Sequence, residues 1–250
     1  DSGDTVVIES DGSVISAIHK LEGAESAGLP WISPGWIDLQ VNGCGGYDLN
    51  AEHISPDDVE GVTRTLHRHG VAMYLPTVIT GHIDRMRRGL QTIAAYCRSK
   101  QFAHESVAGI HLEGPYLSGL PGSRGAHPEQ FMCDPDWDQF MKLQEAADGL
   151  IAMVTLAPER DGAVPFIEKL VANGIVAAIG HTAASSDQIE RAVAAGATFS
   201  THLGNGSQTM LPRHPNYIWH QLAEDRLWAT LIPDGHHLEP PVLKTMVRAK

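Results

Sequence analysis

The chain has 250 residues, of which 42% are hydrophobic and 19% are charged, and its formal net charge is −12. This composition is typical of a soluble globular enzyme and unlike that of a disordered chain. The negative charge argues against a nucleic-acid partner, because nucleic-acid binding depends on neutralising phosphates with cationic side chains.

The cysteines and the apolar runs indicate a cytoplasmic protein without a membrane partner. Cys44, Cys97 and Cys133 make an odd count and include no Cys-x-x-Cys pair, which favours reduced thiols over a disulfide framework. No apolar run reaches the length of a membrane span, and no signal peptide is visible.

The first predicted element is a hairpin. Residues 5–8 and 13–18 are apolar strands on either side of Ser10-Asp11-Gly12, which is a good turn sequence. A lone hairpin is marginally stable in water. We therefore expect residues 1–30 to be part of a small β domain that needs further strands.

From residue 31 onward, predicted strands and helices alternate. The strands cover residues 31–41, 72–79, 107–112, 151–156, 175–179, 197–200 and 227–232. The helices cover residues 55–69, 83–100, 135–147, 164–173, 185–195, 217–224 and 240–250. The helix at residue 55 opens with Ser-Pro-Asp-Asp, and the one at residue 185 opens with the capping-box sequence Ser-Ser-Asp-Gln.

This alternation predicts an α/β protein with a parallel sheet. An open doubly wound sheet is disfavoured, because the glycines of residues 43–46 lack the GxGxxG spacing. Ligand-type residues at the ends of many strands are instead typical of a (β/α)₈ TIM-type barrel. We expect residues 31–250 to form an incomplete barrel of seven visible strands, with the eighth expected beyond Lys250 or absent.

The ends of these strands carry the candidate chemistry. Four apolar runs end in ligand-type residues. Residues 107–112 lead into Glu113, residues 175–179 into His181, residues 197–200 into His202, and residues 227–232 into Asp234 and His237. Two His and one Glu are a known catalytic zinc environment. The alternative that both His are hydrogen-bonded core residues and Glu113 is a buried ion-pair partner stays open at this point.

Several motifs resemble those of a known family. HLEGP (residues 111–115), GHT (180–182), THLGN (201–205) and PDGHH (233–237) occur in the order and setting of the amidohydrolase superfamily. PGWIDLQVNGCGG (34–46) closely resembles the first barrel strand of the N-acetylglucosamine-6-phosphate deacetylases. The resemblance implies a metal-dependent deacetylase that converts N-acetylglucosamine 6-phosphate into glucosamine 6-phosphate and acetate.

The resemblance also implies the metal site. Glu113, His181 and His202 would bind one divalent metal ion, expected to be zinc. In much of the superfamily the first strand carries a His-x-His metal pair, and here Gln40 and Asn42 stand in those places. Because neither amide is a good zinc ligand, we expect one metal ion rather than two.

Substrate-binding residues follow from the same resemblance. His127 matches a substrate-binding His in the loop of residues 118–128, and Asn205, Gly206 and His237 match sugar-phosphate contacts. Arg213 matches an Arg that reaches the phosphate from a neighbouring subunit, which implies a homodimer. The family usually has Asn-Ala where this chain has Asn205-Gly206.

The catalytic residue is not visible in this sequence. The family uses an Asp at the end of the eighth strand, which we expect beyond Lys250. Asp234 is a weak substitute, and we expect it to orient His237 or the loop instead. Two rival functions stay open: another amidohydrolase acting on a cyclic amide or an N-acyl amino acid, and a truncated, non-catalytic barrel.

Overall fold

The computed structural model describes residues 3–23, 28–99 and 101–250. Contacts between Cα atoms divide the chain into two units, Asp1–Pro34 and Gly35–Lys250. Among the described residues, no helix is both long and apolar enough to cross a membrane.

The first unit contains the predicted hairpin. Strand β1 (Val6–Asp11) pairs antiparallel with β2 (Val14–Lys20). Val14, Ile15 and Ile18 leave more than half of their surface exposed. The assignment of residues 1–30 to a partial β domain stays a prediction, and residues 24–27 of that stretch lie outside the described part.

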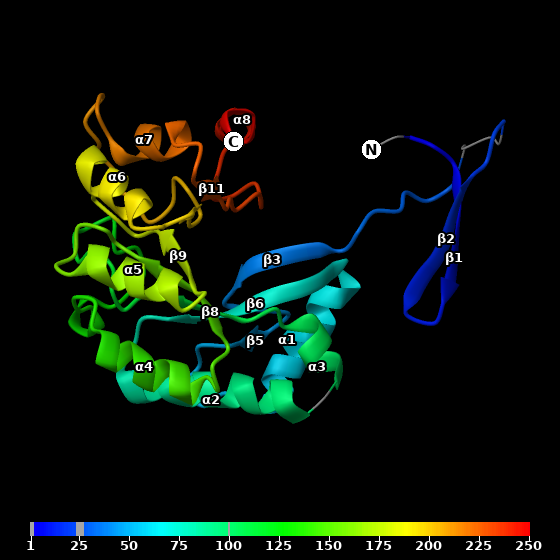
Figure 1. The fold of residues 1–250 in the computed structure, drawn as a ribbon, viewed down its shortest axis with the longest axis horizontal. Coiled ribbons are helices and arrows are strands. Elements are labelled where there is room, and N and C mark those ends of the chain that lie inside the picture. The colour runs from blue at the N-terminus through cyan, green and yellow to red at the C-terminus, as the bar shows by residue number, and fades with distance from the viewer. Residues whose placement is uncertain (1–2, 24–27, 100) are drawn as a thin grey trace. The chain divides into compact units, whose positions relative to one another are not determined.

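The second unit is built on a parallel sheet of seven strands in the order β11-β10-β9-β8-β7-β6-β3. Its strands are β3 (Trp36–Val41), β6 (Val71–Ile79), β7 (Ile110–Glu113), β8 (Ile151–Leu156), β9 (Val176–Ile179), β10 (Phe199–Ser200) and β11 (Trp228–Ala229). A short antiparallel pair, β4 (Gly43–Cys44) and β5 (Tyr47–Asp48), follows β3. The parallel sheet with helices along its outer side fits the predicted TIM-type barrel with seven strands (Figure 1).

The helices also agree with the predicted alternation. They are α1 (Pro56–Arg68), α2 (Ile83–Ser99), α3 (Gln101–Ser106), α4 (Trp137–Ala146), α5 (Ala163–Ala172), α6 (Ser186–Ala194), α7 (Tyr217–Ala223) and α8 (Pro240–Ala249), with a 3₁₀ turn, η1 (Glu129–Phe131). Both predicted capped starts are present: Ser55 caps α1 with Asp58, and Ser185 caps α6 with Gln188. The sequence did not predict α3, η1, β4 or β5, which are too short to show a periodic pattern.

Some strand bounds differ from the prediction. The strand expected at residues 107–112 begins only at Ile110, because Gly109 takes φ of 150° and Val107 makes a single bridge to Tyr74. It also runs one residue further and includes Glu113. The strands expected at residues 197–200 and 227–232 contain two residues each.

Side-chain alternation along β7 separates core from site. Ile110 and Leu112 are fully buried in the main apolar cluster. His111 and Glu113 point to the opposite face of the sheet, because successive side chains of a strand alternate. The strand that contributes to the core is therefore the same strand that presents the carboxylate.

We expect Leu112→Ala to lower the free energy of unfolding by about 2–5 kcal/mol, because it leaves a cavity in a packed core. Leu120→Ala is the matched control, since Leu120 is 50% exposed. Urea denaturation followed by circular dichroism measures both. Equal losses in the two variants would contradict this assignment of the core.

Candidate metal centre

The carboxylate of Glu113, 2% exposed, is the centre of a cluster of side chains. Its Oε1 lies 2.9 Å from His202 Nε2, 3.3 Å from His181 Nε2 and 2.9 Å from Gln40 Nε2. Its Oε2 lies 3.6 Å from His127 Nε2. These partners come from β3, the 118–128 loop and the ends of β9 and β10, so the curled sheet assembles the cluster.

The structure thus brings Glu113, His181 and His202 together, as the sequence predicted. It adds His127, which the sequence assigned to the substrate. The candidate ligand atoms of Glu113, His127 and His181 lie within 4.8 Å of one another. Imidazole nitrogens around a carboxylate are a donor set that suits a divalent metal ion.

The orientation of the His181 ring indicates what Nε2 must bind. His181 Nδ1 lies 2.9 Å from the carbonyl oxygen of Ser123, and since a carbonyl oxygen only accepts, Nδ1 carries a proton. In the neutral ring, Nε2 then presents a lone pair to Glu113 Oε1, which is also an acceptor. Two acceptors 3.3 Å apart require a proton or a metal cation between them, so the arrangement fits a metal ion.

Protonation in the cluster is shaped by burial. Burial alone would raise the pKa of Glu113, but the imidazoles of His181 and His202 beside its carboxylate hold that pKa well below its usual value. Burial lowers the pKa of His127 to about 4. Glu113 is therefore ionised and His127 neutral near pH 7, and these are the forms that bind metal ions.

The backbone at the two strand-end histidines is strained. The φ angle is 48° at His181 and 31° at His202, and the other non-glycine residue with positive φ among those described is Asp148. Left-handed φ at a non-glycine residue costs of order 1–3 kcal/mol and persists only where the surroundings impose it. Here the His181 carbonyl accepts a hydrogen bond from the Ser118 N–H at 3.0 Å.

A polar chain crosses the inner face of the sheet beside the cluster. Burial lowers the pKa of His111 to about 4, so this ring is neutral. Its Nδ1 donates to the Leu39 carbonyl at 3.1 Å, and its Nε2 accepts from Thr155 Oγ1 at 2.7 Å. Thr155 Oγ1 in turn lies 2.7 Å from Thr201 Oγ1. The chain links β3, β7, β8 and the residue after β10, and thereby fixes the strands that carry the cluster.

Glycines pack directly on the His181 ring. A Cβ added at Gly206 would lie 2.6 Å from His181 Nδ1, and one at Gly125 would lie 3.0 Å from its Cε1. The remaining cavity beside the ring, lined in part by His181, Asn205 and Gly206, has a volume of about 10 Å³. Such a volume admits about one water molecule.

The other predicted site residues lie outside the cluster. Asn205 Nδ2 donates to the His202 carbonyl at 3.3 Å, whereas Arg213 is exposed in the loop between β10 and α7. His237 is exposed, and its Nδ1 lies 2.7 Å from Asp234 Oδ2. Asn42, expected beside Gln40, is exposed beyond the end of β3.

Asp234 is a poor proton acceptor in this structure. Its Oδ1 accepts the backbone N–H groups of His237 and His236 at 2.9 Å and 2.8 Å. These two hydrogen bonds and the contact with the His237 side chain hold the pKa of Asp234 well below its usual value. The geometry agrees with the expectation that Asp234 orients His237 and its loop.

Sequence reasoning missed two neighbours of the cluster. Gln40 was noted only as a departure from the His-x-His pair, yet its amide donates to Glu113 Oε1. Glu159 was not singled out, although its carboxylate binds Thr182 and Ala183, directly after His181. The sequence does contain a signal for Glu159. Like Glu113, it is a carboxylate close to the end of a strand, here β8.

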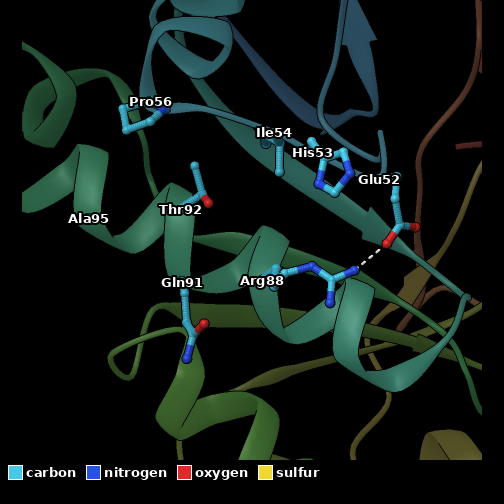
Figure 2. Close-up of a pocket in the computed structure, with 8 residues that line it drawn as sticks. All are labelled: Glu52, His53, Ile54, Pro56, Arg88, Gln91, Thr92 and Ala95. Carbon is cyan, nitrogen blue, oxygen red and sulfur yellow. Dashed lines mark hydrogen bonds and ion pairs between the residues drawn. The ribbon is translucent and has the colours of Figure 1, made fainter.

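Larger cavities lie elsewhere. One of about 330 Å³ separates the loop before α1 from α2 (Figure 2). Its wall includes Arg88, which is ion-paired with Glu52, so this cation is already neutralised. Another, of about 460 Å³, lies between the start of α6 and the loop before α7.

We expect Gly206→Ala to destabilise the protein more than Gly46→Ala. Both glycines have positive φ, but a Cβ at Gly46 meets no atom within 4 Å, whereas one at Gly206 meets the His181 ring. Gly46→Ala should cost about 1–2 kcal/mol, from backbone strain alone. Urea unfolding of both variants measures the difference, and equal losses would mean that Gly206 does not pack on His181.

Comparison with known proteins supports the resemblance drawn from the motifs. No protein-family model matches the chain. It is 31% identical over 212 residues to an N-acetylgalactosamine-6-phosphate deacetylase of Escherichia coli O157:H7, covering 85% of this chain and 55% of the relative. It is 35% identical over 223 residues to the N-acetylglucosamine-6-phosphate deacetylase of Bacillus subtilis (strain 168), covering 87% of this chain and 54% of the relative.

A solved structure agrees with these relatives. The crystal structure of N-acetylglucosamine-6-phosphate deacetylase from Pasteurella multocida superposes with a TM-score of 0.83 at 31% identity, covering 98% of this chain and 64% of that one. The chain spans a little over half the length of the two curated relatives. Over most of its own length, the chain is thus homologous to N-acetylglucosamine-6-phosphate deacetylases.

Proposed function

We propose that the protein is a metal-dependent deacetylase that hydrolyses the N-acetyl amide of N-acetylglucosamine 6-phosphate to glucosamine 6-phosphate and acetate. The observation that carries this proposal is the buried carboxylate of Glu113, which faces imidazoles from the ends of β9 and β10. The names of the homologous enzymes supply the substrate class.

In this proposal Glu113, His181 and His202 hold one divalent metal ion, taken to be zinc. When bound, such an ion lowers the pKa of a water ligand and polarises the carbonyl of the scissile amide. Gln40 supports a single metal ion rather than two. Its amide donates to Glu113 Oε1, at a position where much of the superfamily has a ligand of a second metal ion.

The remaining residues bind the substrate. His127 is neutral and buried beside Glu113, so its ring can orient the acetyl group next to the metal. Asn205 and Gly206 border the His181 ring and would contact the sugar phosphate. Arg213 and His237 are exposed. Arg213 would reach the phosphate bound by a neighbouring subunit, so the active form would be a homodimer. The proposed location of the enzyme is the cytoplasm.

Proton transfer needs a further group. A base must take the proton of the attacking water and return it to the leaving amine. Asp234 is a weak candidate, because two backbone N–H groups and His237 already occupy its oxygens. The resemblance assigns this step to an Asp at the end of an eighth strand.

We expect Glu113→Gln to abolish tight zinc binding, because an amide is a poor zinc ligand and carries no charge to pair with the ion. Glu145→Gln is the control, since Glu145 is exposed on α4. Elemental analysis of the purified variants, after zinc loading and desalting, should give about one zinc per chain for the control and wild type. Unchanged zinc content in Glu113→Gln would contradict the assigned site.

Substrate profiling separates this function from its rivals. We expect acetate release from N-acetylglucosamine 6-phosphate to exceed release from N-acetylglucosamine, because the phosphate adds charge-assisted contacts. N-acetylgalactosamine 6-phosphate belongs in the panel, since one relative is named for it. Faster hydrolysis of a cyclic amide or an N-acyl amino acid would favour another amidohydrolase, and zinc binding without any turnover would favour a non-catalytic domain.

A further inference from the structure

Glu159 holds the backbone that follows His181. It lies past the end of β8, between the strands that carry Glu113 and His181. Its Oε2 accepts the hydroxyl of Thr182 at 2.5 Å, and its Oε1 accepts the Ala183 N–H at 2.7 Å. One carboxylate thereby fixes the turn directly after His181 through two hydrogen bonds.

The same turn is held from its other side by the 118–128 loop. Ser123 Oγ donates to the Thr182 carbonyl at 3.1 Å. The Ser123 carbonyl accepts the His181 Nδ1–H at 2.9 Å, which directs Nε2 toward Glu113. Ser123 is fully buried, and Thr182 and His181 are 3% and 7% exposed. His181 is thus held by Ser123 at its ring and by Glu159 at the turn that follows it, with its backbone at φ of 48°.

Only a group with two acceptor oxygens satisfies both donors of the turn. Thr182 Oγ1 also accepts the Ala184 N–H at 3.0 Å, so its own proton must go to Glu159. A glutamine at this position would offer one acceptor oxygen and would direct an NH₂ donor at the other donor. The Thr182 hydroxyl or the Ala183 N–H would then lose its partner.

We propose that Glu159 is a positioning residue for the metal centre, which acts through Thr182 and Ala183 to keep the His181 ring aimed at Glu113. This inference rests on the proposed metal-dependent function. Partners of this kind, one step removed from the ligands, typically account for 10–100-fold in metal affinity. Glu159 itself touches neither substrate nor metal.

The test compares Glu159→Gln, Thr182→Val and Thr182→Ser in the full chain. We expect zinc to bind about 10-fold or more weakly to Glu159→Gln and Thr182→Val, measured by competition with a chelator of known affinity. Thr182→Ser keeps the hydroxyl and should bind zinc as wild type does. Asp58→Asn is the matched control, because Asp58 also accepts one hydroxyl and one backbone N–H, both from Ser55, remote from His181.

A second readout does not depend on metal. Histidine ¹⁵N spectra of the metal-free protein at pH 8, assigned with His181→Ala, should show a protonated Nδ1 in wild-type His181, because this atom donates to the Ser123 carbonyl. Glu159→Gln and Thr182→Val should shift the Nδ1 signal toward that of an unprotonated nitrogen, whereas Thr182→Ser and Asp58→Asn should not.

The outcomes separate the two proposals. If Glu159→Gln binds zinc as tightly as Asp58→Asn and leaves the His181 spectrum unchanged, Glu159 only stabilises the loop and the positioning role is overturned. If wild type binds no zinc, the proposed function fails, and the spectra alone decide the role of Glu159. A loss of unfolding free energy that is equal in Glu159→Gln and Asp58→Asn, with zinc affinity lost only in the first, would support positioning.

Discussion

The constraint on which this structure depends is the burial of a carboxylate. An ionised Glu side chain inside a protein is costly unless it is paired and hydrogen-bonded. At Glu113, Gln40 donates to Oε1, and the Nε2 atoms of His202 and His181 lie 2.9 Å and 3.3 Å from the same oxygen. His127 Nε2 lies 3.6 Å from Oε2. These side chains converge because a curled parallel sheet directs the carboxyl ends of its strands to one edge.

That edge of the sheet is rigid because one face of each strand packs in the apolar core while the other face carries the polar cluster. On β7, Ile110 and Leu112 pack under the helices, while His111 and Glu113 occupy the inner face. The inner face is itself tied together, because neutral His111, Thr155 and Thr201 form a continuous hydrogen-bond chain. The site is therefore carried by strands that are fixed on both faces, and preorganised ligands of this kind need little rearrangement to bind a metal ion.

The loops around His181 approach its ring closely at Gly206. In this structure a Cβ at that position would lie 2.6 Å from His181 Nδ1, and the backbone there has φ of 56°. Glycine lets the loop after His202 approach the ring. Ser123 of the 118–128 loop binds the ring itself, and Glu159, past the end of the neighbouring strand β8, binds the backbone N–H of Ala183. The His181 ring is thus enclosed by backbone rather than by bulky side chains.

The sequence by itself determined the strand and helix order, the count of seven strands, and the three residues at the centre of the cluster. Those features depend on local patterns: apolar runs, capping residues such as Ser55, and a ligand-type residue directly after a strand. Only the tertiary structure decided that His127 and Gln40 join Glu113, that Glu159 supports His181, and that Asp234 is already occupied by His236 and His237. Such contacts join residues up to 73 positions apart or depend on the conformation of loops, and neither the periodicity nor the spacing of a sequence encodes a distance between loops.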